Sequence, residues 1–184
     1  MGAWLKSRAN RNPSQDRSVA VLEDLLAPGL RLVICGTAAS DRSARLGAYY
    51  AGPGNKLWST LYTVGLTPRQ LAPTDYRTAK EYGIGFTDLA KDQSGNDAAI
   101  DFHKDQRERL RAAILIAQPA FLCFNGKRAA TEYLESKRVA YGLHATTIGA
   151  TRLFVAPSTS GAANGSWDLS IWEELARLVL QEVR

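Results

Sequence analysis

The sequence predicts an α/β fold, a three-layer sandwich with a mainly parallel central sheet. Short apolar runs typical of buried strands lie at 30–35, 120–124 and 151–155. Helical patterns with a single apolar stripe follow such runs, most clearly at 101–118 and 168–183. This alternation favours parallel strands that are joined by helical crossovers.

In the first half of the chain we expect a helix, a strand, a second helix and a short strand. They are expected at residues 18–26, at 30–35, from Asn55 onward and around 83–88. A prolyl, polar stretch and a short helical piece separate the last two. The short strand is bracketed by Gly83 and Gly85 and would present Asp88 at its end. The loop at 92–97 follows from its Ser-Gly-Asn content.

The second half begins with the clearest helix, at 101–118, which Pro119 ends. A buried strand, another helix, an irregular stretch, a strand and a last helix follow. They are expected at 120–124, 127–134, 135–150, 151–155 and 168–183.

The composition fits one globular domain at 18–184 preceded by a flexible basic arm at 1–17. The chain has 184 residues, 45% hydrophobic and 22% charged, with a formal net charge of +5. The arm is poor in apolar residues and carries four cations against one acid. It is interpreted as a solvated tail, with contact to a polyanion as the alternative.

Several classes of protein are disfavoured. No apolar run approaches the roughly 18 residues of a membrane span, and the first residues lack the apolar core of a signal peptide. Cys35 and Cys123 lie in apolar runs, as reduced thiols usually do. Two cysteines and two histidines, widely scattered, do not predict a metal site. We therefore expect a cytoplasmic protein without metal or cofactor.

The stretch at 47–58 combines two tyrosines with a Gly-Pro-Gly turn and a helix start. Asn55 is a good helix N-cap. An aromatic pair ahead of a helix start suits a wall that stacks on a flat ligand. The alternative is a rigid loop with two packing tyrosines.

Four loops should meet at the carboxyl ends of the strands, where ligands bind in such folds. They lie at 36–40, 86–88, 125–127 and 157–161. Their residues are small, hydroxylic or amide-bearing, with Asp88 as the acid.

Several short motifs occur along the chain in the order that a known family shows. They are Tyr50 with Gly-Pro-Gly-Asn-Lys-Leu-Trp at 52–58, Gly-Leu-Thr at 65–67, Gln-Leu at 70–71, Tyr-Gly-Ile-Gly-Phe-Thr at 82–87, Phe-Asn-Gly-Lys at 124–127 and Pro-Ser-Thr-Ser at 157–160. Over residues 22–161 the chain resembles the mismatch-specific uracil-DNA glycosylase and thymine-DNA glycosylase family.

The resemblance implies an enzyme that flips a damaged base out of DNA and hydrolyses its N-glycosidic bond without a metal. It implies that Tyr50 stacks on the flipped pyrimidine, that Asn55 reads its edge, and that Gly36, Thr37 and Ala38 line the base pocket. It also implies residues that hold the DNA backbone, namely Asn125, Gly126, Lys127, Ser158, Thr159 and Ser160. Asn55 as a cap only, Tyr50 as a packing residue only and Lys127 as a plain surface lysine are the alternatives.

The first motif of the family falls at residues 36–40, Gly-Thr-Ala-Ala-Ser, where this chain departs from the family. It usually reads Gly-Ile-Asn-Pro-Gly, and its asparagine orients the attacking water, but here residue 38 is alanine. Asp88 is the favoured replacement, at a position where relatives carry asparagine or lysine. A carboxylate can stabilise an oxocarbenium-like sugar and accept a proton from water. Asp41 is the second choice and Asp92 the third, and Asp88 as a turn cap is the alternative.

The loop after Gly161 departs as well, because Ala162 and Ala163 stand where relatives place a bulky or basic residue that fills the gap in the DNA. We expect weak dependence on the opposite base and a monomer acting on DNA with uracil or mismatches. The alternative is a damage-binding protein of the same fold with weakened catalysis. A protein for free nucleotides is less favoured, because no phosphate-loop glycine signature follows the first strand.

Overall fold

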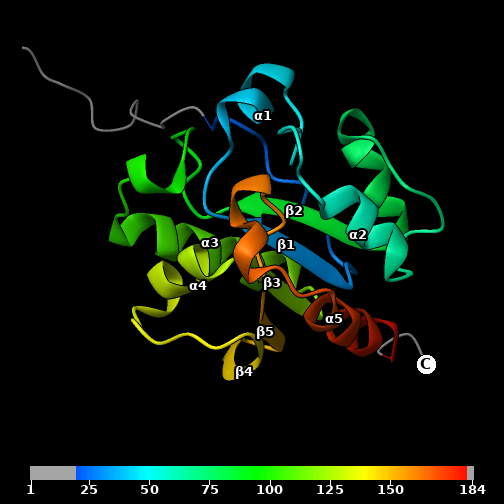
Figure 1. Cartoon of the computed structure of the whole chain (residues 1–184). Helices are drawn as coiled ribbons and strands as arrows, with labels where there is room; N and C mark the ends of the chain where they lie inside the picture. The colour runs from blue at the N-terminus through cyan, green and yellow to red at the C-terminus, as the bar shows by residue number, and fades with distance from the viewer. Residues whose placement is uncertain (1–19, 182–184) are drawn as a thin grey trace, which may run out of the picture.

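The computed structural model describes residues 20–181, so the predicted arm at 1–17 lies outside the described part. A five-stranded sheet with the order β2-β1-β3-β5-β4 forms the centre of the domain (Figure 1). Its strands are β1 Leu32–Gly36, β2 Ile84–Asp88, β3 Phe121–Asn125, β4 Gly142–Ile148 and β5 Thr151–Ala156. All neighbours are parallel except β4, which pairs antiparallel with β5. The predicted α/β fold with a mainly parallel sheet is confirmed.

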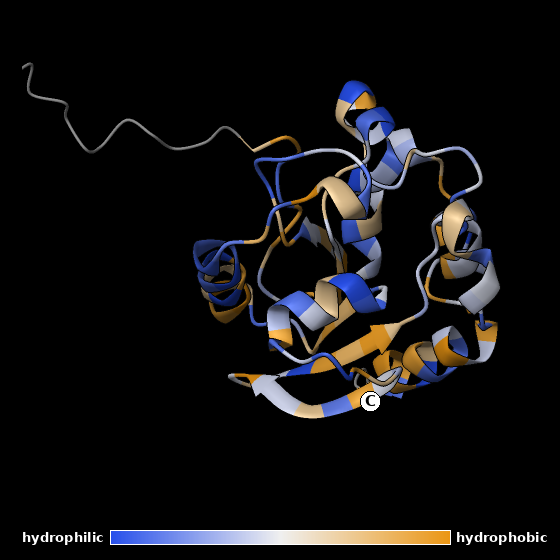
Figure 2. Cartoon of the chain, turned by 60° about the vertical axis from the view of Figure 1, so that its left-hand side comes forward, coloured by the Kyte–Doolittle hydropathy of each residue, from blue (hydrophilic) through white to orange (hydrophobic). Residues whose placement is uncertain are grey.

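Helices cover both faces of the sheet. The helices α3 Lys104–Ala117 and α4 Lys127–Leu134 cover one face. The other face carries α2 Leu57–Thr63, the 3-10 helix η1 Pro73–Tyr82 and α5 Leu169–Gln181. In Figure 2 the central strands are mostly hydrophobic, and hydrophilic residues lie mainly on the surrounding helices and loops.

Alternate residues of the strands supply the two cores, as the two-residue period of a strand requires. Leu32 and Ile34 of β1 pack with α2 and α5, while Val33 and Cys35 pack with α3 and α4. All four side chains are fully buried. A central strand that is buried on both faces explains why the sequence shows a continuous apolar run there.

The predicted helix at 18–26 is wrong over its described residues, 20–26. Leu25 instead pairs antiparallel with Phe86, through backbone hydrogen bonds of 2.9 and 3.1 Å. Since β2 lies at the edge of the sheet, its backbone groups need partners, and Leu25 supplies them. Leu22 and Leu25 are both buried in the core, so their spacing mimics a helical stripe.

Three further elements differ from expectation. The stretch expected to be irregular contains β4, whose residues are mostly exposed and therefore show no apolar pattern. The helix α3 begins at Lys104, three residues later than predicted. A short helix that was not predicted, α1 Asp41–Leu46, is capped by the Ser40 hydroxyl, which accepts a hydrogen bond from the Ser43 amide.

The parallel strands end level with one another. Gly36 is paired with Asp88, and Asn125 is paired with Ala156. The four predicted loops therefore leave the same edge of the sheet. No helix within 20–181 is long and apolar enough to cross a bilayer.

Candidate active site

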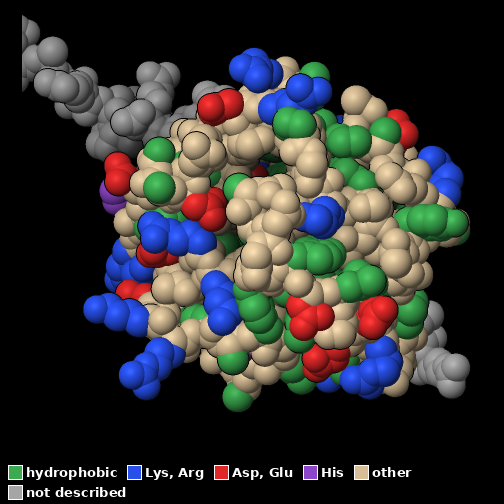
Figure 3. Space-filling view, in the orientation of Figure 1, with side chains coloured by type: hydrophobic (Ala, Val, Ile, Leu, Met, Phe, Trp, Pro, Cys, Tyr) green, Lys and Arg blue, Asp and Glu red, His purple; other side chains and the backbone are tan. Residues whose placement is uncertain are grey.

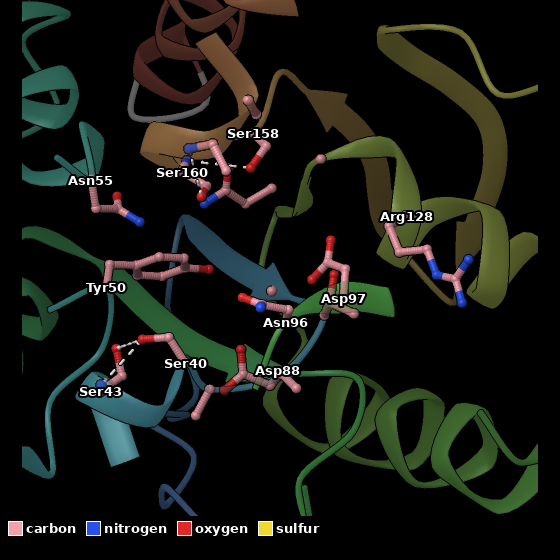
Figure 4. A pocket seen from close by; sticks show the side chains of 18 of the residues that line it. Ser40, Ser43, Tyr50, Asn55, Asp88, Asn96, Asp97, Arg128, Ser158 and Ser160 are labelled. Carbon is pink, nitrogen blue, oxygen red and sulfur yellow. Dashed lines mark hydrogen bonds between the residues drawn. The ribbon is translucent and has the colours of Figure 1, made fainter. Parts of the chain in front are cut away.

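A cavity of about 620 Å³ opens at this edge of the sheet. All four predicted loops line it, together with the stretch at 47–58 (the aromatic loop), residues 95–98 and the start of α4 (Figure 4). The predicted site residues in its wall are Gly36, Thr37, Ala38, Tyr50, Asn55, Asp88, Asn125, Gly126, Lys127, Ser158 and Ser160. Asp41, Asp92 and Thr159 do not line it.

Asp88 ends β2, and its side chain lies in the cavity wall. The residue is only 3% exposed, yet its carboxylate forms no hydrogen bond or ion pair within residues 20–181. Burial raises the pKa of Asp88 to about 6; Lys91 opposes this rise, Asp24 adds to it and Arg109 opposes it. A carboxylate with such a pKa is ionised at neutral pH and accepts a proton more readily than an exposed aspartate.

The absence of a side chain at Gly36 brings Asp88 close to the first strand. A Cβ atom at Gly36 would lie 2.5 Å from Asp88 Oδ1 and 3.2 Å from the Tyr50 hydroxyl oxygen. Gly36 is the sheet partner of Asp88, so the strand pairing itself sets this distance. The first motif, the acid and the aromatic loop therefore converge on one point.

Tyr50 forms an aromatic wall of the cavity, and its backbone is unusual. Its φ is 54°, a left-handed value that non-glycine residues seldom adopt and that often marks a functional position. The backbone of the next residue is fixed by two hydrogen bonds from the α1 region: the Ala51 amide donates to Ser43 Oγ at 3.1 Å, and Arg42 Nε donates to the Ala51 carbonyl at 2.9 Å.

The Tyr50 hydroxyl is buried and has no hydrogen-bond partner of normal geometry among the described residues. Burial raises its pKa, Asp88 and Cys35 raise it further, and the nearby Asn125 amide lowers it. The phenol therefore keeps its proton and can donate a hydrogen bond to a ligand.

The N-cap of α2 is Lys56, one residue after the predicted cap Asn55. Asn55 Oδ1 accepts a hydrogen bond from the Leu57 amide at 3.0 Å, at the start of α2. Its side-chain nitrogen has no partner within the described residues and points toward the cavity in Figure 4. The oxygen of Asn55 therefore closes the turn before α2, and its nitrogen remains available for a contact in the cavity.

Comparison with known proteins places this arrangement in a family. Residues 23–176 match the model of the uracil DNA glycosylase superfamily. The chain belongs to the uracil DNA glycosylase superfamily. A solution NMR structure of a candidate uracil DNA glycosylase from Methanosarcina acetivorans is similar, with a TM-score of 0.61 and 25% identity, over 86% of this chain and 96% of that chain. Membership supports a DNA glycosylase activity, the hydrolysis of N-glycosidic bonds in DNA during base excision repair.

A network of charged side chains contacts the backbone of Asp88. Asp24 forms ion pairs with Lys91 at 2.9 Å and with Arg109 at 2.8 Å. Arg109 Nη2 also donates to the Asp88 carbonyl at 2.6 Å. This network could not be predicted from the sequence, because Asp24 and Arg109 lie 85 residues apart and no short motif joins them.

The end of β3 is tied to the loop after β5 by a reciprocal pair of hydrogen bonds. Asn125 Nδ2 donates to Thr159 Oγ1 at 2.8 Å, and the Thr159 amide donates to Asn125 Oδ1 at 2.9 Å. Thr159 is fully buried. The pair fixes the loop so that Ser158 and Ser160, both half-buried, line the cavity.

The other predicted acids have local partners outside the cavity. Asp41 accepts a hydrogen bond from Ser94 Oγ at 3.1 Å, and Asp92 accepts one from Gln106 Nε2 at 3.2 Å. Asp97, which was predicted only as part of a loop, also lines the cavity, but it is exposed. Asp88 is thus the buried carboxylate of the cavity wall. Within residues 20–181 no group of three His, Cys, Asp or Glu side chains could hold a metal.

Proposed function

We propose that this chain is a monofunctional uracil-DNA glycosylase of the mismatch-specific and thymine-DNA glycosylase type. It flips uracil out of DNA and hydrolyses the bond between base and deoxyribose, leaving an abasic site. The observation that carries the proposal is the Asp88 carboxylate, which lies in the cavity wall beside Tyr50 and the first motif and has no partner in the described part of the chain.

The flipped base stacks on the Tyr50 ring and is read by Asn55. The Asn55 nitrogen donates to a uracil carbonyl, while its Oδ1 can accept a second hydrogen bond besides that of Leu57. Gly36, Thr37 and Ala38 close the pocket with small groups. The Tyr50 hydroxyl is a further donor for the base or for the water.

Asp88 supplies the chemistry in place of the missing asparagine. The bond between the sugar C1′ and the base nitrogen breaks, and its electron pair leaves with the base. The negative charge of Asp88 stabilises the oxocarbenium-like sugar. A water molecule then bonds to C1′ and gives its proton to Asp88. Ala38 cannot take part, because a methyl group neither orients nor activates water.

The DNA backbone is held by Ser158, Ser160, Gly126 and Lys127. These residues line one side of the cavity and offer hydroxyl, amide and ammonium groups, which position DNA without reading its sequence. Asn125 and Thr159 contribute by fixing the loop, since their side chains are bonded to each other.

A uracil-release assay tests the proposal. The protein is incubated with an oligonucleotide that contains one uracil, and abasic sites are then cleaved with alkali. Strand cleavage that depends on uracil is the expected result. The alternative, a damage-binding protein, is favoured by Ala38 and predicts tight binding to uracil-containing duplexes with no cleavage of any of them. That outcome would overturn the catalytic proposal.

The pH dependence of the reaction rate should follow the ionisation of the Asp88 carboxyl group. Because the base must be ionised and its pKa is about 6, kcat/KM is expected to fall about tenfold per pH unit below pH 6. Single-turnover rates between pH 4.5 and 8 measure this. A profile that is flat through pH 6 would contradict Asp88 as the base.

Dependence on the opposite base should be weak. Ala162 and Ala163 lie at the rim of the cavity, where small side chains make a poor wedge for the DNA stack. Rates on U:G, U:A and single-stranded uracil are expected to agree within about tenfold, an energy range of about 1.4 kcal/mol. Excision confined to U:G would show that another group acts as the wedge.

A further inference from the structure

A second hollow adjoins the cavity and is lined by basic residues. This basic groove has a volume of about 580 Å³, and its lining residues are Lys127, Thr131, Lys137, Arg138, Val139 and Ala140. Lys127 lines both the groove and the cavity. Its ammonium group lies 4.3 Å from the centre of the Tyr141 ring, which is also part of the cavity wall. The two hollows therefore share Lys127 in their walls.

The cations of the groove are not neutralised by nearby acids. Lys127, Lys137 and Arg138 are exposed and form no ion pair within residues 20–181. Neighbouring arginines differ, since Arg107 pairs with Glu135 at 2.8 Å and Arg128 with Glu132 at 3.3 Å. The nearby glutamates are thus paired with these arginines, and the positive charges of the three groove residues remain together at the surface.

The charge on this face of the molecule is uneven. In Figure 3 basic side chains predominate over α3 and α4, with acidic ones among them, whereas acidic side chains predominate over α5, with basic ones beside them. A polyanion that leaves the cavity is attracted toward α4 and the groove and is repelled by α5.

We propose that the basic groove binds backbone phosphates of the DNA strand that carries the flipped nucleotide, beyond those held at the cavity itself. The inference rests on the proposed function, and it adds Lys137 and Arg138 to the DNA-binding residues. Lys127 connects the two parts of the path. The groove presents positive charges and, among its described lining residues, has no asparagine or glutamine side chain that could read a base. Its contribution to DNA affinity is therefore expected to be independent of sequence and sensitive to salt.

The test is a double variant, Lys137→Gln with Arg138→Gln, in the full chain. Binding to a fluorescent 20-nucleotide DNA without uracil is measured by anisotropy over a range of salt concentrations. Loss of two phosphate contacts should weaken binding at 0.1 M salt on the order of 10- to 100-fold. The slope of log K against log salt should become shallower by about 1.5. A double variant in the opposite layer, Arg69→Gln with Lys80→Gln, removes the same charge and should leave the slope unchanged.

Uracil release separates this inference from the proposed function. For the groove variant, KM on a long oligonucleotide should rise while kcat stays constant, and KM on an oligonucleotide of about four nucleotides should stay constant. The proposal that the groove binds DNA would be overturned by an unchanged salt slope in the groove variant, or by an equal change of slope in both double variants. Failure of the wild-type chain to release uracil would overturn the enzymatic proposal alone, because the binding measurement does not depend on catalysis.

Discussion

Replacing Asp88 by asparagine is expected to reduce uracil release by about 10²- to 10⁴-fold, the usual contribution of a positioned acid or base. The amide keeps the shape of the side chain and can still accept a hydrogen bond from water. It can neither take the proton of that water nor carry negative charge toward the sugar. Single-turnover release of uracil at pH 7.5 measures the loss, and binding to uracil-containing DNA should persist.

The same substitution is expected to stabilise the protein at neutral pH. Burial raises the pKa of Asp88 to about 6, so the folded chain binds its proton more tightly than the unfolded chain does. The stability from this group is present below pH 4 and is lost as pH rises through 6. A rise from near 4 to about 6 corresponds to about 3 kcal/mol, which is the upper limit for the gain in Asp88→Asn. Thermal unfolding should show a higher Tm for the variant at pH 7.5 and equal Tm values near pH 4.

Asp41→Asn is the matched control, because Asp41 lies outside the cavity and bonds only to Ser94 among the described residues. It should change uracil release less than threefold. Near-wild-type release by both Asp88→Asn and Asp88→Ala would remove Asp88 from the mechanism. A large loss in Asp41→Asn would direct attention to the second candidate instead.

Gly36→Ala is expected to produce the second large effect. The new Cβ would lie 2.5 Å from Asp88 Oδ1, well inside van der Waals contact, and 3.2 Å from the Tyr50 hydroxyl oxygen. One of these side chains must move, because Gly36 is held in β1 between two other strands. We expect at least a 10²-fold loss of kcat/KM, since displacing a catalytic group by 1 Å has effects of this order. Overpacking should also destabilise the fold by about 1–3 kcal/mol.

Gly52→Ala provides the comparison for this change. Its Cβ would meet only Ser40 Oγ, at 3.9 Å, which is ordinary contact. It should therefore retain activity within about threefold and unfold at nearly the wild-type temperature. Uracil release by Gly36→Ala at the wild-type rate, from a folded protein, would mean that the closeness of Gly36 and Asp88 is unimportant for the reaction.

Much of the fold could be predicted because its strands and helices are locally distinct. The buried strands β1, β3 and β5 appear as apolar runs, and α3 and α5 show a single buried stripe. Elements that are held by backbone pairing and show no apolar pattern of their own type were predicted wrongly. Leu25 adopts an extended backbone only because Phe86 offers it hydrogen bonds, and β4 forms only because β5 does the same.

The chain of amino acids by itself determined which residues reach the edge of the sheet. Asp88, Asn125 and the hydroxyl groups of 158–160 follow strands, and parallel strands end on one side. Only the tertiary structure decided what each of them does there. It leaves the Asp88 carboxylate without a partner among residues 20–181, in a buried wall, and it engages Asn125 and Thr159 with each other. It also places Asp24, Lys91 and Arg109 behind the acid. The pKa of a carboxyl group depends on burial and on charges a few ångströms away, and those neighbours come from segments far apart in the sequence.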